Sequence, residues 1–208
     1  MKITWIGHSC FKIESKGSSI ILDPYADGSV PGYKPLREKA NAVYCSHKHG
    51  DHSGEEWIEI IPDPKSPFTV TKISTYHDNQ MGRLRGKNVI FIIEDGEHRI
   101  AHMGDLGCSL TKEQINQLTD LDAVMIPVGG FYTINAMQAA EIVELIEPRM
   151  VIPMHYRDMI EGVVYGYDEI SGVSDFLEDF DSVITLNESE VNTNSIPARV
   201  VVLQPRNR

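Results

Sequence analysis

Hydrophobic and polar positions along the chain predict many short strands and a few short helices. Apolar runs typical of strands recur from end to end, at residues 3–6, 11–14, 19–22, 69–76, 89–93, 99–103, 123–126, 150–154, 183–186 and 199–203. Apolar residues at helical spacing occupy segments 53–61, 111–118, 135–146 and 174–180. Ser53 and Thr111 stand where helix caps are expected. Strands that alternate with helices in this way predict a layered α/β domain.

Histidine and aspartate residues gather directly after several of these strands. The densest group is Cys45-Ser-His-Lys-His-Gly-Asp-His-Ser-Gly54, which follows the short apolar segment 42–45. His47, His49, Asp51 and His52 therefore lie in a loop that leaves the carboxyl end of a buried strand. Neutral imidazoles combined with a carboxylate suit first-row divalent metals, so this loop is predicted to bind metal.

The segment Ser46-His-Lys-His-Gly-Asp-His52 resembles the metal-binding motif of the metallo-β-lactamase fold superfamily. Further segments fit the same resemblance, namely 7–11, 21–24, 102–107 and 152–156. They are most similar to a branch of small hydrolases that resemble L-ascorbate-6-phosphate lactonase. The resemblance covers nearly the whole chain. It implies a four-layer αββα sandwich in which metal ligands converge along one edge.

The resemblance also implies a set of ligands for two metal ions. They are His47, His49 and His77 for the first ion, Asp51, His52 and His155 for the second, and Asp105 as the bridge. His102 is the alternative to His77, although alternation along its strand places it on the opposite face from Asp105 and favours a core histidine. Zinc is the default metal for these ligands, and manganese, iron or nickel are compatible with them.

Two such ions, about 3.5–4 Å apart, would activate a bridging hydroxide that attacks a small-molecule ester, lactone or phosphoester. Asp51 and Asp105 are the residues expected to take part in catalysis. His8, Tyr132, Tyr156 and Arg157 are the expected substrate contacts, and the resemblance also places Asp23 near the metals. The breaker-rich segment 26–36 is expected to border the substrate pocket, and segment 158–172 to cover it.

Length, composition and charge limit the binding partners and the cellular compartment that the protein is expected to have. The 208 residues suit one domain, residues 1–208, and no apolar run is long enough to cross a membrane. A formal charge of −11 makes nucleic acid a poor partner. The resemblance implies a small-molecule substrate, including an anionic one. Arg83, Arg85 and Lys87 form a small basic group that either binds such an anion or is a solvated loop. The start of the chain has neither a long apolar region nor a small-residue cleavage site, which predicts a cytoplasmic protein. The three cysteines are odd in number and show no close pair spacing, which argues against a disulfide framework.

Three other functions compete with a dinuclear hydrolase. A phosphodiesterase or nuclease of the same fold is disfavoured by the acidic charge. A redox di-iron protein of this fold would carry Glu at the position of His49. A metal-binding regulatory module without turnover has no positive support in the sequence, but the ligand set is compatible with it.

Overall fold

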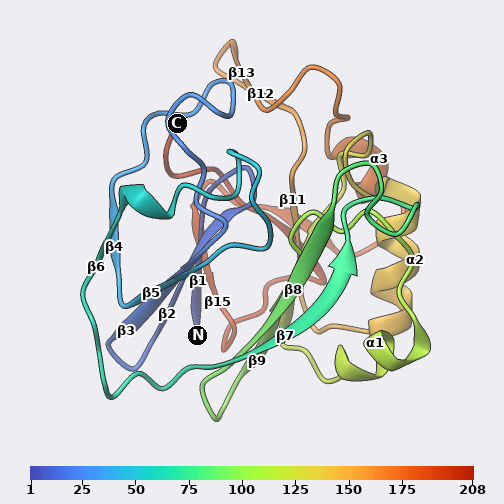
Figure 1. The fold of residues 1–208 in the computed structure, drawn as a ribbon. Helices are drawn as coiled ribbons and strands as arrows, with labels where there is room; N and C mark the ends of the chain where they lie inside the picture. The colour runs from blue at the N-terminus through green and yellow to red at the C-terminus, as the bar shows by residue number, and fades with distance from the viewer.

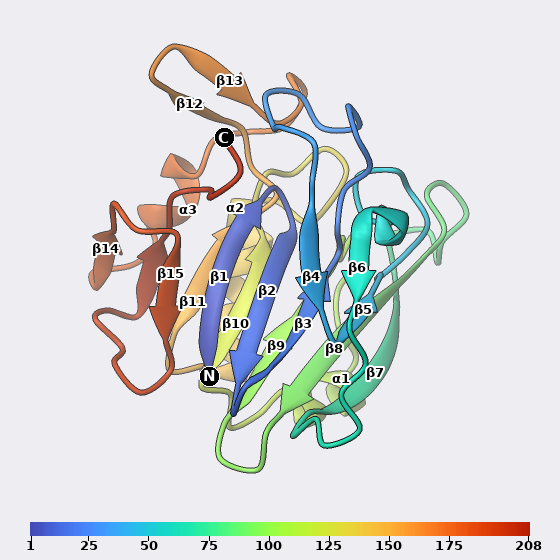
Figure 2. The same cartoon turned by 90° about the vertical axis from the view of Figure 1, so that its left-hand side faces the viewer.

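Two twisted β-sheets face each other in the computed structural model, which describes residues 1–208 (Figures 1 and 2). The first sheet has the strand order β15-β1-β2-β3-β5. Its strands are β1 (Lys2–Gly7), β2 (Cys10–Ser15), β3 (Ser18–Leu22), β5 (Ala42–Tyr44) and β15 (Glu190–Asn192). The strands β1, β2 and β3 form an antiparallel meander, whereas β5 pairs with β3 in parallel.

The second sheet has seven strands in the order β14-β16-β11-β10-β9-β8-β7. They are β7 (Thr69–Tyr76), β8 (Lys87–Glu94), β9 (Arg99–His102), β10 (Ala123–Pro127), β11 (Val151–Met154), β14 (Val183–Thr185) and β16 (Val200–Val202). Within this sheet, β9, β10, β11, β16 and β14 run parallel to one another. By contrast, β8 runs antiparallel to both of its neighbours, β9 and β7. The parallel strands therefore all end at the same edge, where polar loops can meet.

The main hydrophobic core fills the space between the two sheets. Side chains alternate along a strand, so Ile3 and Trp5 of β1 enter this core while Ile6 points to the other face. From the second sheet, strands such as β10 are buried on both faces. Trp5 packs against Phe11 and Tyr156, with ring centroids 6.5 and 5.5 Å away. This packing fixes the strand ends that carry the polar residues.

Three α-helices cover the outer face of the seven-stranded sheet (Figure 1). They are α1 (Lys112–Gln117), α2 (Ala136–Ile146) and α3 (Ser174–Leu177). Thr111 and Asn135 cap α1 and α2, each through a reciprocal pair of hydrogen bonds with a glutamine three residues later. No helix of the protein has the length and apolarity that a membrane crossing requires.

The outer face of the first sheet is covered differently. Ile6, Cys10 and Ile21 pack there against Ala40 of β4 (Glu38–Ala40) and Ile58 of β6 (Ile58–Ile60), and a 3-10 turn, η1 (Glu55–Trp57), precedes β6 (Figure 2). The helix predicted over 53–61 is therefore wrong. Ser53 donates to His49 O instead of capping a helix, and the chain pairs as β6 with β4. The strands β15, β12 (Asp158–Ile160) and β13 (Val163–Tyr165) were not predicted.

Candidate metal centre

Five segments that leave the ends of strands meet at one edge of the sandwich. His8 follows β1, loop 46–54 follows β5, His77 follows β7, Asp105 follows β9 and His155 follows β11. Their ligand atoms fall into overlapping groups, each with all its members within 4.8 Å of one another. Residues up to 147 positions apart in the chain thus share one small volume, because the strands before them belong to two facing sheets.

The first group consists of three imidazoles, those of His47, His49 and His77. The ring of His47 lies 4.6 Å from that of His49 and 4.8 Å from that of His77, measured between centroids. His77 is buried where β7 ends, whereas His49 is exposed to solvent. Three imidazoles at this spacing, open on one side, form an arrangement that suits a divalent cation with a free position.

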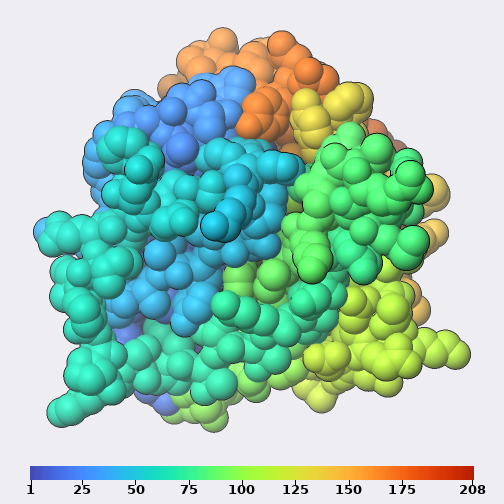
Figure 3. All heavy atoms as spheres, viewed as in Figure 1, coloured from blue at the N-terminus to red at the C-terminus, as the bar shows by residue number.

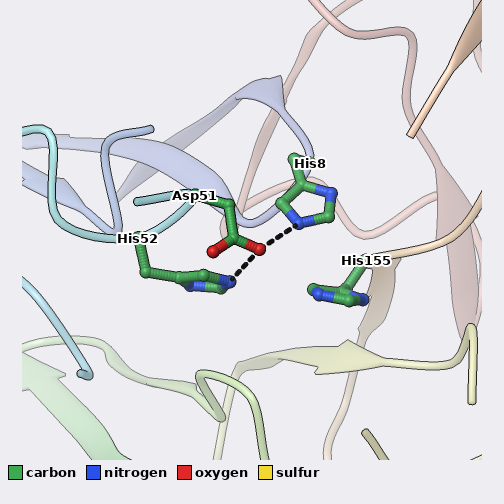
Figure 4. A group of neighbouring side chains, drawn as sticks. All are labelled: His8, Asp51, His52 and His155. Atoms are coloured by element: carbon green, nitrogen blue, oxygen red, sulfur yellow. Dashed lines mark ion pairs between the residues drawn. The ribbon is translucent and has the colours of Figure 1, made fainter. Parts of the chain in front are cut away.

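The second group consists of His8, Asp51, His52 and His155, whose side chains point toward one another (Figure 4). Asp51 Oδ2 lies 3.4 Å from His8 Nε2 and 3.6 Å from His52 Nε2. The rings of His8 and His155 are 4.2 Å apart. His8 and His155 both have positive φ angles, 53° and 52°, so each turns its side chain into the cluster directly after its strand.

Asp105 lies between the two groups. Its Oδ1 is 3.0 Å from His52 Nε2, and its Oδ2 is 3.2 Å from His77 Nε2 and 3.3 Å from His155 Nε2. Gly104 makes this position possible, because a Cβ there would come within 2.3 Å of Asn88 Oδ1. The same Asn88 oxygen accepts a hydrogen bond from the Asp105 amide at 2.9 Å. One buried carboxylate thus contacts imidazoles of both groups.

Asp23 fixes the orientation of His52 from behind. The buried carboxylate accepts hydrogen bonds from Ser46 N and Ser46 Oγ, both at 2.6 Å, and lies 2.8 Å from His52 Nδ1. A carboxylate can only accept, so Nδ1 of His52 carries the hydrogen and Nε2 presents a lone pair to Asp105. Two lone pairs facing each other at 3.0 Å require a proton or a metal ion between them.

Two further observations show that these side chains fit a bound cation. Several buried ring nitrogens and one carboxylate oxygen of these residues have no hydrogen-bond partner: His8 Nδ1 and Nε2, His47 Nε2, His52 Nε2, His77 Nδ1, Asp105 Oδ1, and His155 Nδ1 and Nε2. Burial opposes a charge on His52, yet the carboxylates around it outweigh burial and raise its pKa. Burial likewise opposes ionisation of Asp105, but His155 and His52 hold its pKa well below the usual value. The cluster carries buried negative charge that a cation would compensate.

A pocket of about 300 Å³ opens onto this cluster. It is lined by His49, Asp51, His77, Arg85, Asp105, Tyr132 and Tyr167. Segments 79–90, 128–134 and 160–170, green, yellow and orange in Figure 3, meet the cyan segment that contains loop 46–54 on this face. Its volume stands at the lower end of the range for small-molecule sites.

Of the four expected substrate contacts, only Tyr132 lines this pocket. His8 is fully buried beneath it, within the second group. Tyr156 and Arg157 do not line the pocket, and their role as substrate contacts stays a prediction. Tyr156 is buried against Trp5, and Arg157 pairs with Asp168 at 3.3 Å.

The two segments that were expected at the pocket, 26–36 and 158–172, contribute to it in different ways. Segment 26–36 contributes no lining residue, but Ser29 O accepts a hydrogen bond of 2.7 Å from the Tyr167 hydroxyl and so holds that ring over the site. Tyr167 belongs to segment 158–172, which was expected to cover the pocket. The sequence did not single out Tyr167, because a lone Tyr in an irregular segment belongs to no recognisable motif.

His102 is a core histidine, as the alternation of its strand indicates. Its Nε2 donates to Ser9 O at 2.9 Å, and its Nδ1 accepts from Gly104 N at 3.2 Å. Both nitrogens are therefore engaged in hydrogen bonds, so His102 has no free lone pair for a metal. Its contribution is to hold the turn that carries Asp105 against the β1–β2 turn.

Comparisons with known proteins agree with this geometry. The model of the β-lactamase superfamily domain matches residues 2–155, which include every residue of both groups and Asp105. The chain is 30% identical to the UPF0173 protein of Pyrococcus furiosus over 183 residues, which cover 75% of this chain and 83% of that protein. It is 27% identical to a UPF0173 metal-dependent hydrolase of Methanopyrus kandleri over 193 residues, covering 75% and 84% of the two chains.

A solved structure from Thermotoga maritima is similar over almost its entire length. It is described as a candidate zinc-dependent hydrolase of the metallo-β-lactamase superfamily. The TM-score is 0.75 and the identity 30%, and the similarity covers 97% of each chain. The similarity therefore extends beyond residue 155 to the strands that complete both sheets.

Proposed function

The chain belongs to the metallo-β-lactamase superfamily, and on this premise we propose that it is a metal-dependent hydrolase of small molecules. Its relatives include proteins described as metal-dependent hydrolases, and the clustered imidazoles and carboxylates support the same activity here. The observation that carries the proposal is the position of Asp105, whose two oxygens lie 3.0–3.3 Å from imidazoles of both groups. One carboxylate between two sets of donors suits a pair of cations.

We propose that seven side chains hold two divalent cations. The ligands are His47, His49 and His77 for the first, Asp51, His52 and His155 for the second, and Asp105 between them. Zinc suits these donors, and manganese, iron or nickel are compatible with them. When bound, the ions would supply Lewis acidity and a hydroxide nucleophile at neutral pH for attack on an ester, lactone or phosphoester.

The residues around the cations then have separate tasks. Asp23 keeps the His52 lone pair directed at the cluster, and Asn88 holds the amide of Asp105. Tyr132 and Tyr167 form the wall of the pocket above the cations and restrict the access of water to the substrate. Asp23 and Asn88 thus position proposed ligands, Tyr132 and Tyr167 contact the substrate, and none of the four needs to act as a covalent nucleophile.

The pocket favours a small molecule over nucleic acid. Its volume of about 300 Å³ has no room for a duplex, and Arg85 is the only basic side chain that lines it. A nuclease would need a basic surface that tracks phosphates, whereas this chain carries a formal charge of −11. A binding module without turnover makes the same metal contacts and differs only in kinetics.

A hydrolase panel with matched variants tests the proposal. Protein loaded with zinc or manganese is offered a lactone, a phosphodiester and a thioester, before and after chelation. We expect hydrolysis of at least one class, its loss on chelation and its loss in Asp105→Asn. Lys48→Ala is the control, because Lys48 is exposed in the same loop and its side chain forms no hydrogen bond or ion pair with the proposed ligands. A fully metal-loaded protein without turnover of any class would refute the enzymatic proposal.

A further inference from the structure

The pocket above the proposed metal site contains one permanently charged cation, the guanidinium of Arg85. We propose that Arg85 binds an anionic group of the substrate, a carboxylate or a phosphate, while the bond to be hydrolysed lies at the clustered imidazoles. The substrate class is then a small ester or lactone that carries a separate anion. This inference rests on the proposed function for the reaction, and on the pocket itself for the charge.

Arg85 differs from most arginines of the protein in having no carboxylate partner. Six of the nine arginines form ion pairs, namely Arg37, Arg99, Arg149, Arg157, Arg199 and Arg206. Arg85 is half-buried and lies in none of these pairs, although Asp51 and Asp105 line the same pocket. In a chain with 30 acidic and 19 basic residues, an unpaired guanidinium in a pocket is available to a ligand.

The Arg85 side chain is held in place by an aromatic ring. Its guanidinium carbon lies 5.6 Å from the centroid of the Tyr132 ring, within the range of a cation–π contact. Such a contact orients the planar group and leaves its N–H donors free at the edge. Tyr167 continues the same wall, 5.7 Å from Tyr132. The cation therefore faces a defined space rather than bulk solvent.

The backbone beneath Arg85 is fixed as well. The buried Asp78 carboxylate accepts hydrogen bonds from four backbone amides of loop 79–86, those of Gln80, Gly82, Leu84 and Arg85, at 2.7–3.0 Å. The loop closes where His77 N donates to Gly86 O at 3.1 Å. Asp78 follows His77 directly, so one short segment positions both a proposed metal ligand and Arg85. The distance between the anion site and the metals is thereby set by the fold.

Matched substrates isolate the contribution of the anion. The test compares γ-butyrolactone with the same ring bearing a carboxylate, and with the ring bearing a phosphorylated hydroxymethyl group. We expect Arg85→Gln to raise KM for the charged lactones about 10- to 100-fold, with little change in kcat and no change for the neutral lactone. Arg85→Lys should recover part of the loss. The control is Arg83→Gln, which removes an exposed arginine of the same loop that does not line the pocket.

A binding measurement separates this inference from the hydrolase proposal. Calorimetry with tetrahydrofuran-2-carboxylate, which has no hydrolysable bond, and with neutral tetrahydrofurfuryl alcohol reports on Arg85 even if no lactone is turned over. Tighter binding of the carboxylate that is lost in Arg85→Gln and kept in Arg83→Gln supports the inference. In the kinetic test, an effect of Arg85→Gln on only one of the two charged lactones identifies the anion of that lactone as the bound group. Equal selectivity in wild type and Arg85→Gln would overturn it, whatever the fate of the hydrolase proposal.

Discussion

The substitution Asp23→Asn tests whether the Asp23 carboxylate keeps His52 in the orientation that the proposed metal site needs. The Asp23 carboxylate is fully buried, lies 2.8 Å from His52 Nδ1 and accepts two hydrogen bonds from Ser46. Asparagine keeps the shape but replaces one acceptor oxygen with an NH₂ donor. If the NH₂ faces His52, the imidazole must move its hydrogen to Nε2, where the lone pair for the metal should be. If the NH₂ faces Ser46 N instead, two hydrogen-bond donors face each other and neither has an acceptor.

The expected magnitude follows from these contacts. Loss of an outer partner of a metal-binding histidine typically weakens metal affinity about 10- to 100-fold, which corresponds to about 1.4–2.8 kcal/mol. The buried donors left without an acceptor should lower the free energy of unfolding of the metal-free protein by about 1–3 kcal/mol. Both effects arise from one change, so they should appear together.

Competition with a chromophoric chelator measures the metal affinity, and urea unfolding measures the stability. The control is Asp78→Asn, because Asp78 is also a buried carboxylate next to a proposed ligand but accepts only backbone amides. It should leave the affinity for the second metal near that of wild type. If Asp23→Asn folds and binds both metals as tightly as wild type, the tautomer reasoning is wrong.

Two further predictions concern the residues that support the site and the sheets. Gly104→Ala should lower the free energy of unfolding, measured in urea, by about 2–4 kcal/mol. The reason is that φ at Gly104 is +54° and that the added Cβ would come within 2.6 Å of Asn88 and Ser46. A loss under about 0.5 kcal/mol would contradict this prediction. Burial opposes ionisation of Asp95, but hydrogen bonds from Ser15 and two backbone amides lower its pKa. Its contribution is therefore present above the unfolded pKa of about 3.9 and is lost as pH falls through the lower native value. Asp95→Asn should cost about 1–3 kcal/mol at pH 7 and less at pH 3, and a cost independent of pH would refute the assignment.

The sequence predicted best those features that depend on local pattern. The strands before His77, Asp105 and His155 were predicted because alternation and apolar runs report burial directly. The sandwich itself followed from the resemblance carried by loop 46–54 and agrees with the family match. The ligand roles remain predictions, although the structure brings all seven side chains into one volume.

Features that depend on tertiary contacts were not predictable. Segment 53–61 has helical spacing, yet pairing of β6 with β4 overrides it. Tyr156 and Arg157 follow a proposed ligand in sequence, but Tyr156 packs against Trp5, Arg157 pairs with Asp168, and neither lines the pocket. Arg85 was one of three basic residues close in sequence, and its half-buried position in the pocket over Tyr132 distinguishes it from the exposed Arg83.

Metal content per chain tests the dinuclear centre most directly. Wild type, His49→Ala and His155→Ala would be loaded with zinc, desalted and measured by plasma mass spectrometry, with Lys48→Ala as the control. A centre in which the two imidazoles serve different ions predicts about two ions per chain in wild type and in Lys48→Ala, and about one in each histidine variant. Identical metal content in wild type and both histidine variants would contradict it.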